Sequence, residues 1–181
     1  GNSAYADCKQ AHAPILNMES EISSFMFNGY HQYAPLKAAY GGAFHEMEAI
    51  TVGAWIRVIS KPGAGKVYPI VDFGGENFFS FYVDEVGRLG FKTHNNMLTD
   101  DLHEDTADQT SLSIGQWTYV VATYDEHSGI KKIYRNGKVT ASKNAGSSAL
   151  LDSAKWNPHP VYGMIGVDST AKTFNGGHGV N

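Results

Sequence analysis

Short runs of alternating apolar and polar residues, separated by turn signals, constrain the fold of this chain most. The clearest case is Ile130–Arg135 and Lys138–Ser142, which flank the dipeptide Asn136-Gly137. Asn-Gly favours the positive φ angles of a type I′ turn, so a β-hairpin is predicted here. In Ala49–Val58 alternate residues also separate into an apolar and a mixed face, as in a strand with one buried side. No segment shows a long helical apolar period, so the sequence predicts an all-β protein.

Turn signals recur about every 8–12 residues, which is typical of a sandwich or barrel of short antiparallel strands. Residues 94–113 are polar and acidic and are predicted to be a long loop. Residues 1–20 show weak patterning and are predicted to be an irregular N-terminal arm. Further strands are predicted at Ser23–Phe27, Tyr30–Pro35, Val67–Asp72, Phe78–Val83, Arg88–Thr93, Gln116–Tyr124 and Val161–Val167.

Composition and charge exclude several classes of protein. The chain has 181 residues, of which 42% are hydrophobic and 18% charged, as in one globular domain rather than a disordered segment. The net charge of −4 provides no basic field for nucleic acid. No stretch is long and apolar enough to span a membrane. The chain starts at Gly1 rather than Met, so we expect a processed product whose targeting segment is already gone.

Five blocks of sequence, in a fixed order, carry a resemblance to a known family. They are Phe25–Tyr33, Ile50–Arg57, Gly115–Asp125, Ile133–Val139 and Tyr162–Gly166. The blocks resemble the laminin-G-like/pentraxin branch of the concanavalin-like fold. That resemblance implies a two-sheet antiparallel jelly-roll sandwich over residues 21–181, preceded by the arm of residues 1–20. It also implies core positions for Trp55 and Trp117.

The C-terminal part departs from the family pattern. Members usually close with a strand of the type G-x-I-D-E-V-R-I-Y, whereas here Phe174–Gly177 is followed only by His178–Asn181. We therefore expect an open sheet edge, which tends to pair with another strand. Either residues 1–20 fold back into the gap, or a partner chain or a second copy fills it. We favour a partner, with Cys8, the only cysteine, as a covalent tie or else a free thiol.

Calcium is the cofactor that the resemblance implies. Pentraxins hold calcium with an acid-Asn pair and with acids after a later strand, which here correspond to Glu76, Asn77 and Asp168. Calcium takes six to eight oxygen ligands, and carboxylates from two adjacent loops suit it. Only Asp168 represents the second group of acids, and the alternative is that all three are solvated turn residues.

Two other groups of side chains are candidates for function. Tyr30, His31 and Tyr33 lie near the turn signal after Phe27, where exposed rings would stack on sugars. Glu46 and Glu48 are separated like a carboxylate pair on one strand face, but they lack the E-x-D-x-x-E pattern of glycosidases on this fold. Catalysis is therefore not expected.

Two further patterns are explained by structure rather than by function. The acidic run around His103 lacks the spacing of a calcium loop and is predicted to be a solvated loop. Alternation in Phe78–Tyr82 places rings on both faces of a strand, and the core accounts for one face only.

The sequence thus predicts an extracellular or cell-surface binding and adhesion module that recognises a glycan or protein ligand, with or without calcium. The alternative is a structural subunit of an extracellular assembly completed by a partner strand. A polysaccharide-degrading enzyme is the third interpretation. Neither nucleic acid nor a membrane span is expected among its partners.

Overall fold

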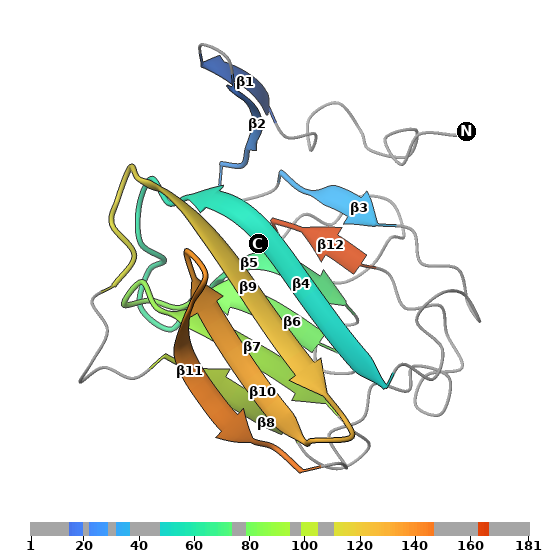
Figure 1. The fold of residues 1–181 in the computed structure, drawn as a ribbon. Coiled ribbons are helices and arrows are strands. Elements are labelled where there is room, and N and C mark those ends of the chain that lie inside the picture. The colour runs from blue at the N-terminus through green and yellow to red at the C-terminus, as the bar shows by residue number, and fades with distance from the viewer. Residues whose placement is uncertain are drawn as a thin grey trace.

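The chain folds almost entirely into β-strands. The computed structural model describes residues 15–19, 22–28, 32–36, 48–73, 79–94, 99–104, 111–146 and 163–166, and these contain strands β1 to β12 and no helix. Two antiparallel sheets face each other, and a two-stranded hairpin lies beside them (Figure 1). The predicted all-β, two-sheet sandwich is confirmed.

The smaller sheet has four strands in the order β11-β10-β9-β4. Its members are β4 (Ala49–Arg57), β9 (Trp117–Asp125), β10 (Ile130–Arg135) and β11 (Lys138–Asn144). The β10–β11 connection is the predicted tight turn, because Asn136 has φ 47° and Gly137 has φ 80°. β4 lies at one edge of this sheet, paired along its whole length with β9.

The larger sheet has six strands in the order β3-β12-β5-β6-β7-β8. They are β3 (Ala34–Leu36), β12 (Gly163–Ile165), β5 (Tyr68–Phe73), β6 (Phe79–Val83), β7 (Leu89–His94) and β8 (Thr99–His103). The long loop predicted for residues 94–113 is wrong at β8, which pairs with β7. The pattern was missed because Leu102 is the only apolar residue of β8, and one inward apolar side chain does not produce visible alternation.

The core lies between the two sheets. β6 contributes Phe79 and Phe81, and β7 contributes Phe91, all at most 1% exposed. The opposing sheet contributes Val120, Ala122, Tyr124 and Ile133. The predicted two-sided ring pattern of β6 is confirmed, since Tyr82 is buried on the other face of its sheet, over Gly90.

One buried ion pair ties the two sheets together. Glu104, directly after β8, is 1% exposed. Its carboxylate accepts hydrogen bonds from the guanidinium of Arg135 on β10, from the N–H of Leu89 (2.9 Å) and from the hydroxyl of Thr140 on β11 (2.6 Å). Burying a carboxylate costs free energy unless such partners surround it, so the group fixes the register between the sheets.

The hairpin consists of β1 (Ile15–Glu19) and β2 (Ile22–Met26), which pair with each other and with no other described strand. The irregular structure predicted for residues 1–20 is therefore wrong over β1. The strands predicted at Ser23–Phe27 and Tyr30–Pro35 appear as β2 and β3, which do not pair with each other, because β2 pairs with β1 and β3 pairs with β12. Leu16 and Phe25 are among the cross-strand partners of this hairpin.

Candidate functional site

Two large aromatic side chains lie exposed on the outer side of the four-stranded sheet. Trp55 of β4 is 64% exposed and Tyr119 of β9 is 38% exposed. They are direct cross-strand partners, and their ring centroids lie 5.4 Å apart with planes tilted by 41°. Two pairs further along, the guanidinium carbon of Arg57 lies 5.4 Å from the ring centroid of Trp117. We call Trp55, Tyr119, Arg57 and Trp117 the aromatic face.

The local sequence holds Tyr119 in place. A Cβ at Gly53 would lie 3.0 Å from the Tyr119 hydroxyl, so this ring extends over the position where β4 has no side chain. The N–H of Tyr119 donates to the side-chain oxygen of Asn136 at 3.0 Å, which couples it to the β10–β11 turn. The aromatic face is therefore a fixed surface rather than two independent side chains.

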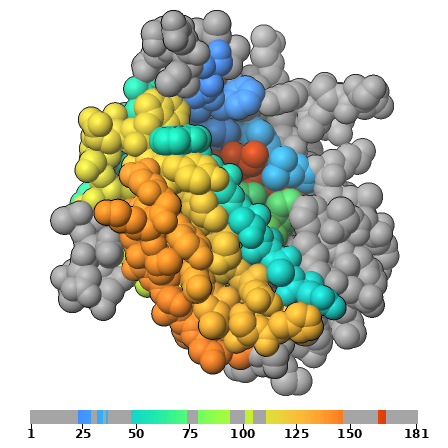
Figure 2. All heavy atoms as spheres, in the orientation of Figure 1, coloured from blue at the N-terminus to red at the C-terminus, as the bar shows by residue number. Residues whose placement is uncertain are grey.

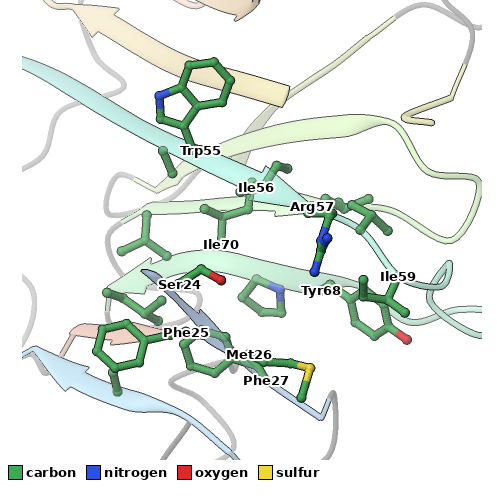
Figure 3. A pocket seen from close by; sticks show the side chains of 18 of the residues that line it. Ser24, Phe25, Met26, Phe27, Trp55, Ile56, Arg57, Ile59, Tyr68 and Ile70 are labelled. Carbon is green, nitrogen blue, oxygen red and sulfur yellow. The ribbon is translucent and has the colours of Figure 1, made fainter. Parts of the chain in front are cut away.

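The core position predicted for Trp55 is wrong. Strand alternation places Trp55 on the opposite side of β4 from Ile56, and Figure 3 shows its ring directed away from the interior. Trp117 is half-buried at the margin of the same surface. The block that carries the family resemblance fixes the strand, but it does not fix which side of the strand another layer covers.

An apolar cleft of about 970 Å³ lies along β4, and its lining includes Trp55 and Arg57 of the aromatic face as well as inward residues of that strand. Its walls are β4, β5, β12 and the stretch from Ser23 to Asn28, and Figure 2 shows atoms of β12 in the opening beside β4. Ile56 and Ile70 line it from the two sheets, while Phe25 and Met26 of β2 are 50% and 42% exposed beside it (Figure 3). The cleft marks the end of the sandwich where described side chains leave the core partly open.

The free edge of β4 runs along this cleft. The N–H of Glu126 donates to the carbonyl of Glu48 at 2.8 Å, which makes them a hydrogen-bonded pair. In an antiparallel pair such positions alternate, so Val52 and Ala54 bond to β9 while the backbone groups of Gly53 and Trp55 face away from it. No described strand pairs with this edge.

A polar cluster occupies the outer side of the six-stranded sheet. The Tyr82 hydroxyl donates to Asp101 at 2.8 Å, and His103 Nε2 lies 3.2 Å from the same carboxylate. Burial alone would raise the pKa of Asp101, but the hydrogen bonds from His103 and Tyr82 outweigh it and hold that pKa below 3.8. The hydrogen bond with Asp101 raises the pKa of His103 above 6.5. The predicted solvated loop is thus a strand carrying an ordered cluster.

Comparison with known proteins agrees with this architecture. A laminin-G-type family model, described as the Concanavalin A-like lectin/glucanases superfamily, matches residues 28–177. The chain belongs to this superfamily. A search of curated proteins found no match to the chain.

Solved structures similar to this concanavalin-like domain share little sequence with it. The ligand-binding domain of botulinum neurotoxin serotype D, in complex with N-acetylneuraminic acid, has a TM-score of 0.55 and 15% identity, over 77% of this chain and 33% of that one. A putative carbohydrate-binding protein from Bacteroides ovatus has a TM-score of 0.52 and 16% identity, over 82% of this chain and 38% of that one. A heptameric pentraxin from Limulus polyphemus has a TM-score of 0.46 and 18% identity, over 69% of this chain and 56% of that one. The chain thus spans less than two thirds of each of these proteins, and its likeness to the first two shows the fold.

Most of the predicted site residues fall outside the described part of the concanavalin-like domain. These are Tyr30, His31, Glu76, Asn77 and Asp168, together with Glu46 and Cys8. Tyr33 is described and is half-buried immediately before β3. The proposed ligand and calcium sites therefore stay predictions.

Within the described ranges, no three His, Cys, Asp or Glu side chains come together as a metal site. Glu48 is described and lies before β4, with a side chain 74% exposed and 3.7 Å from His127. The described residues also contain no helix long and apolar enough to cross a membrane.

Sequence reasoning missed the surfaces that the tertiary structure brings together. Trp55 and Tyr119 are 64 positions apart by number, and Tyr82 and Asp101 are 19 apart. Only the strand pairings make these residues neighbours. The signal in the sequence that could have located these surfaces is strand alternation. In both β4 and β6 it places aromatic side chains on the face opposite the core.

Proposed function

We propose that this domain is a carbohydrate-binding module and that the aromatic face stacks on sugar rings. The exposed pair Trp55 and Tyr119 carries the proposal. The C–H groups on one face of a pyranose ring are apolar and carry partial positive charge, so they match the negative face of an indole or phenol ring. A large aromatic side chain held out of the core by a rigid strand is costly to hydrate, and a sugar ring would relieve that exposure.

Polar side chains on the same outer side of the sheet would supply the hydrogen bonds that sugar hydroxyls require. Thr123 of β9 and Lys132 of β10 are cross-strand partners on the outer side of the sheet, and both are partly exposed. Arg57 lies at the other end of the same surface. Aromatic rings for the apolar face of a sugar and hydroxyl or cationic donors for its rim suit an uncharged or anionic glycan.

The comparisons support this proposal through what similar structures bind. One of them was solved with N-acetylneuraminic acid, an anionic sugar, and another is named a putative carbohydrate-binding protein. An acidic sugar is a suitable first probe, because Arg57 and Lys132 are cations on the aromatic face side of the sheet.

A glycan array with labelled protein tests the function. We expect Trp55→Ala and Tyr119→Ala to lower the affinity for whichever glycan binds by at least about tenfold, which corresponds to about 1.4 kcal/mol. Phe25→Ala is the matched control, since Phe25 is also exposed but lies on β2. Equal binding by wild type and both variants would exclude the aromatic face. A complete lack of glycan binding would exclude the function.

Calcium dependence belongs to the same proposal, with Glu76, Asn77 and Asp168 as the ligands. A metal that binds only the folded state raises the melting temperature by mass action. We expect millimolar calcium to raise it, and Asp168→Asn to reduce the increase. Repeating the array with a chelator asks whether glycan binding needs the metal. An unchanged melting temperature with calcium would remove the site.

We further propose that the domain acts outside the cell, as an adhesion or lectin-like module, and without catalysis. Glu46→Gln and Glu48→Gln should then leave glycan binding intact. Incubation with the bound polysaccharide, followed by reducing-end analysis, checks for hydrolysis. Cleavage that disappears in both variants would show that the carboxylate pair is catalytic. Detection of the protein in the medium or on the surface of its source cells checks the location.

A further inference from the structure

We propose that the outer side of the four-stranded sheet binds consecutive rings of one linear, acidic polysaccharide chain rather than a single terminal sugar. The inference deepens the proposed function and rests on it, because the aromatic face provides the first contact. Tyr134 of β10 supplies a second contact, and the cations Arg57 and Lys132 supply the preference for acidic sugars.

The strand register arranges the outward side chains of this sheet in rows. Val120, Ala122 and Ile133 belong to the core, so the residues between them face outward. Rows lie about 7 Å apart, because each residue of an antiparallel strand advances the chain by about 3.4 Å. In order along the sheet, the rows are Arg57 with Trp117, then Trp55 with Tyr119, then Gly53 with Val121, Tyr134 and Val139, then Thr51 with Thr123, Lys132 and Ser142. The surface that begins with the aromatic face therefore continues toward β10 and β11.

The row that follows Trp55 and Tyr119 is apolar and open. Val139 is 51% exposed, and its cross-strand partner Tyr134 is partly exposed. Gly53 has no side chain, which leaves this row low on β4. Figure 2 shows β4, β9, β10 and β11 facing the viewer and open to solvent. A ligand that lies on Trp55 can therefore continue across this row toward β10 and β11.

The distance between the contacts excludes a single sugar ring. The ring centroids of Trp55 and Tyr119 lie 5.4 Å apart, so one pyranose ring can contact both. Tyr134 lies one row along and two strands across from Trp55, a backbone separation on the order of 12 Å from the strand spacings. The Tyr119 ring extends over Gly53, away from β10, so it does not fill this interval. Successive rings of a linear chain are needed to reach both contacts.

The charges of this surface favour an acidic chain. Arg57 lies in the first of these rows and Lys132 in the last, about 20 Å apart from the strand spacings. Among the paired outward residues of these described strands, the acid is Asp125, beyond Lys132. Its carboxylate accepts hydrogen bonds from the N–H of His127 (2.9 Å) and from the hydroxyl of Ser128 (3.1 Å). Carboxylates on separate sugar rings can thus each meet a cation through charge-assisted hydrogen bonds.

Affinity as a function of chain length is the first test. The probes are oligosaccharides of one, two, four and six rings from polygalacturonic, polymannuronic and polysialic acids, with cello-oligosaccharides as uncharged controls. In at least one acidic series we expect an affinity at least about tenfold higher for four rings than for one, measured by calorimetry or, for weak ligands, by NMR titration.

The outcomes separate this inference from the proposed function. Equal affinity for one and four rings would overturn the inference and leave the function intact. Tighter binding by the uncharged series, or no binding by any acidic series, would also overturn it. The absence of any glycan binding on the array would overturn the function itself.

Variants of Tyr134 locate the second contact. We expect Tyr134→Ala to lower the affinity for four rings by at least about fivefold more than the affinity for one ring, because Trp55 and Tyr119 hold one ring. Tyr134→Phe retains the aromatic ring and should bind four rings more tightly than Tyr134→Ala. Ile114→Ala is the control, since Ile114 is 47% exposed but lies outside the four strands. Equal losses for both lengths, with unchanged melting temperatures, would contradict a second contact.

Lys132→Gln tests the cation at the far end of the surface. The affinity for an acidic chain of four rings should fall by at least about fivefold and become less sensitive to salt. Lys66→Gln makes the same charge change at an exposed position between β4 and β5 and is the matched control. Equal effects of the two substitutions would contradict the role of Lys132.

A second copy of the chain is the other occupant to be tested, because an open apolar row can also bury itself in a dimer. Light scattering of the free protein distinguishes the two, and we expect a monomer. A dimer that dissociates in the Trp55→Ala variant would show that a second copy covers the surface, and would overturn the proposal.

Discussion

The buried carboxylate of Glu104 gives the sharpest test of how the two sheets are held together. Its side chain is 0% exposed, and the facing Arg135 side chain is 13% exposed. Glu104→Gln keeps the size of the side chain and an acceptor for the Leu89 N–H or the Thr140 hydroxyl, but it removes the negative charge beside Arg135. Removing one partner of a buried ion pair costs about 3–5 kcal/mol. Because one acceptor is retained, we expect a loss near the lower end, about 3 kcal/mol.

That loss is a large part of the total for a domain of this size, since folded proteins are stable by only about 5–15 kcal/mol. Urea unfolding followed by tryptophan fluorescence measures it, with an unchanged m-value showing that the unfolded state is the same. Glu48→Gln is the control: its side chain is 74% exposed, so the change should be below about 0.5 kcal/mol.

A double-mutant cycle separates the ion pair from its surroundings. Glu104→Leu combined with Arg135→Met should cost less than the sum of the two single substitutions by at least about 1.5 kcal/mol, because each single variant isolates one buried charge. A Glu104→Gln variant within about 1 kcal/mol of wild type, or strictly additive single effects, would refute the role of this pair in joining the sheets.

Three other outcomes follow from local geometry. His103 has a pKa above 6.5 in the folded state, so its contribution to stability is fully present below about pH 6.5 and is lost as pH rises through the folded pKa. His103→Gln should remove this fall in the free energy of unfolding, measured with urea at a series of pH values. The same fall in the variant would contradict the assignment. Gly137→Ala should cost about 1–2 kcal/mol of thermal stability because φ is 80°; a neutral effect would argue against the type I′ turn. In Gly90→Ala the new Cβ would lie 2.4 Å from the Tyr82 ring, so we expect a loss of about 1–3 kcal/mol in urea unfolding, whereas an unchanged Tyr82–Asp101 hydrogen bond in a crystal structure would contradict the displacement.

The fold class was available from the sequence because strand periodicity and turn chemistry are local. Asn136-Gly137 supplies positive φ angles whatever surrounds it, and the flanking strands pair as predicted. In Ala49–Val58 alternation correctly separated Ile56 from Trp55. The order of the family blocks then selected the concanavalin-like sandwich, which the family match confirms.

β8 and the hairpin β1–β2 were not predictable in the same way. A strand with a single apolar residue, such as Leu102, gains its place from β7 beside it rather than from its own pattern. β2 was predicted as a strand, but its pairing with β1 was not, because periodicity contains no information about which strand lies next to which.

The sequence alone thus determined most of the strands, though not β1 or β8, and also where the tight hairpin turns and which alternate residues of β4 share a face. The tertiary structure decided what lies against each face. It left Trp55 exposed beside Tyr119, brought Tyr82, Asp101 and His103 into one cluster, and opened a cleft along the free edge of β4. The physical reason is that φ/ψ preferences and alternation act over neighbouring residues, whereas burial depends on strands that are distant in the chain and meet only when the sheets pack.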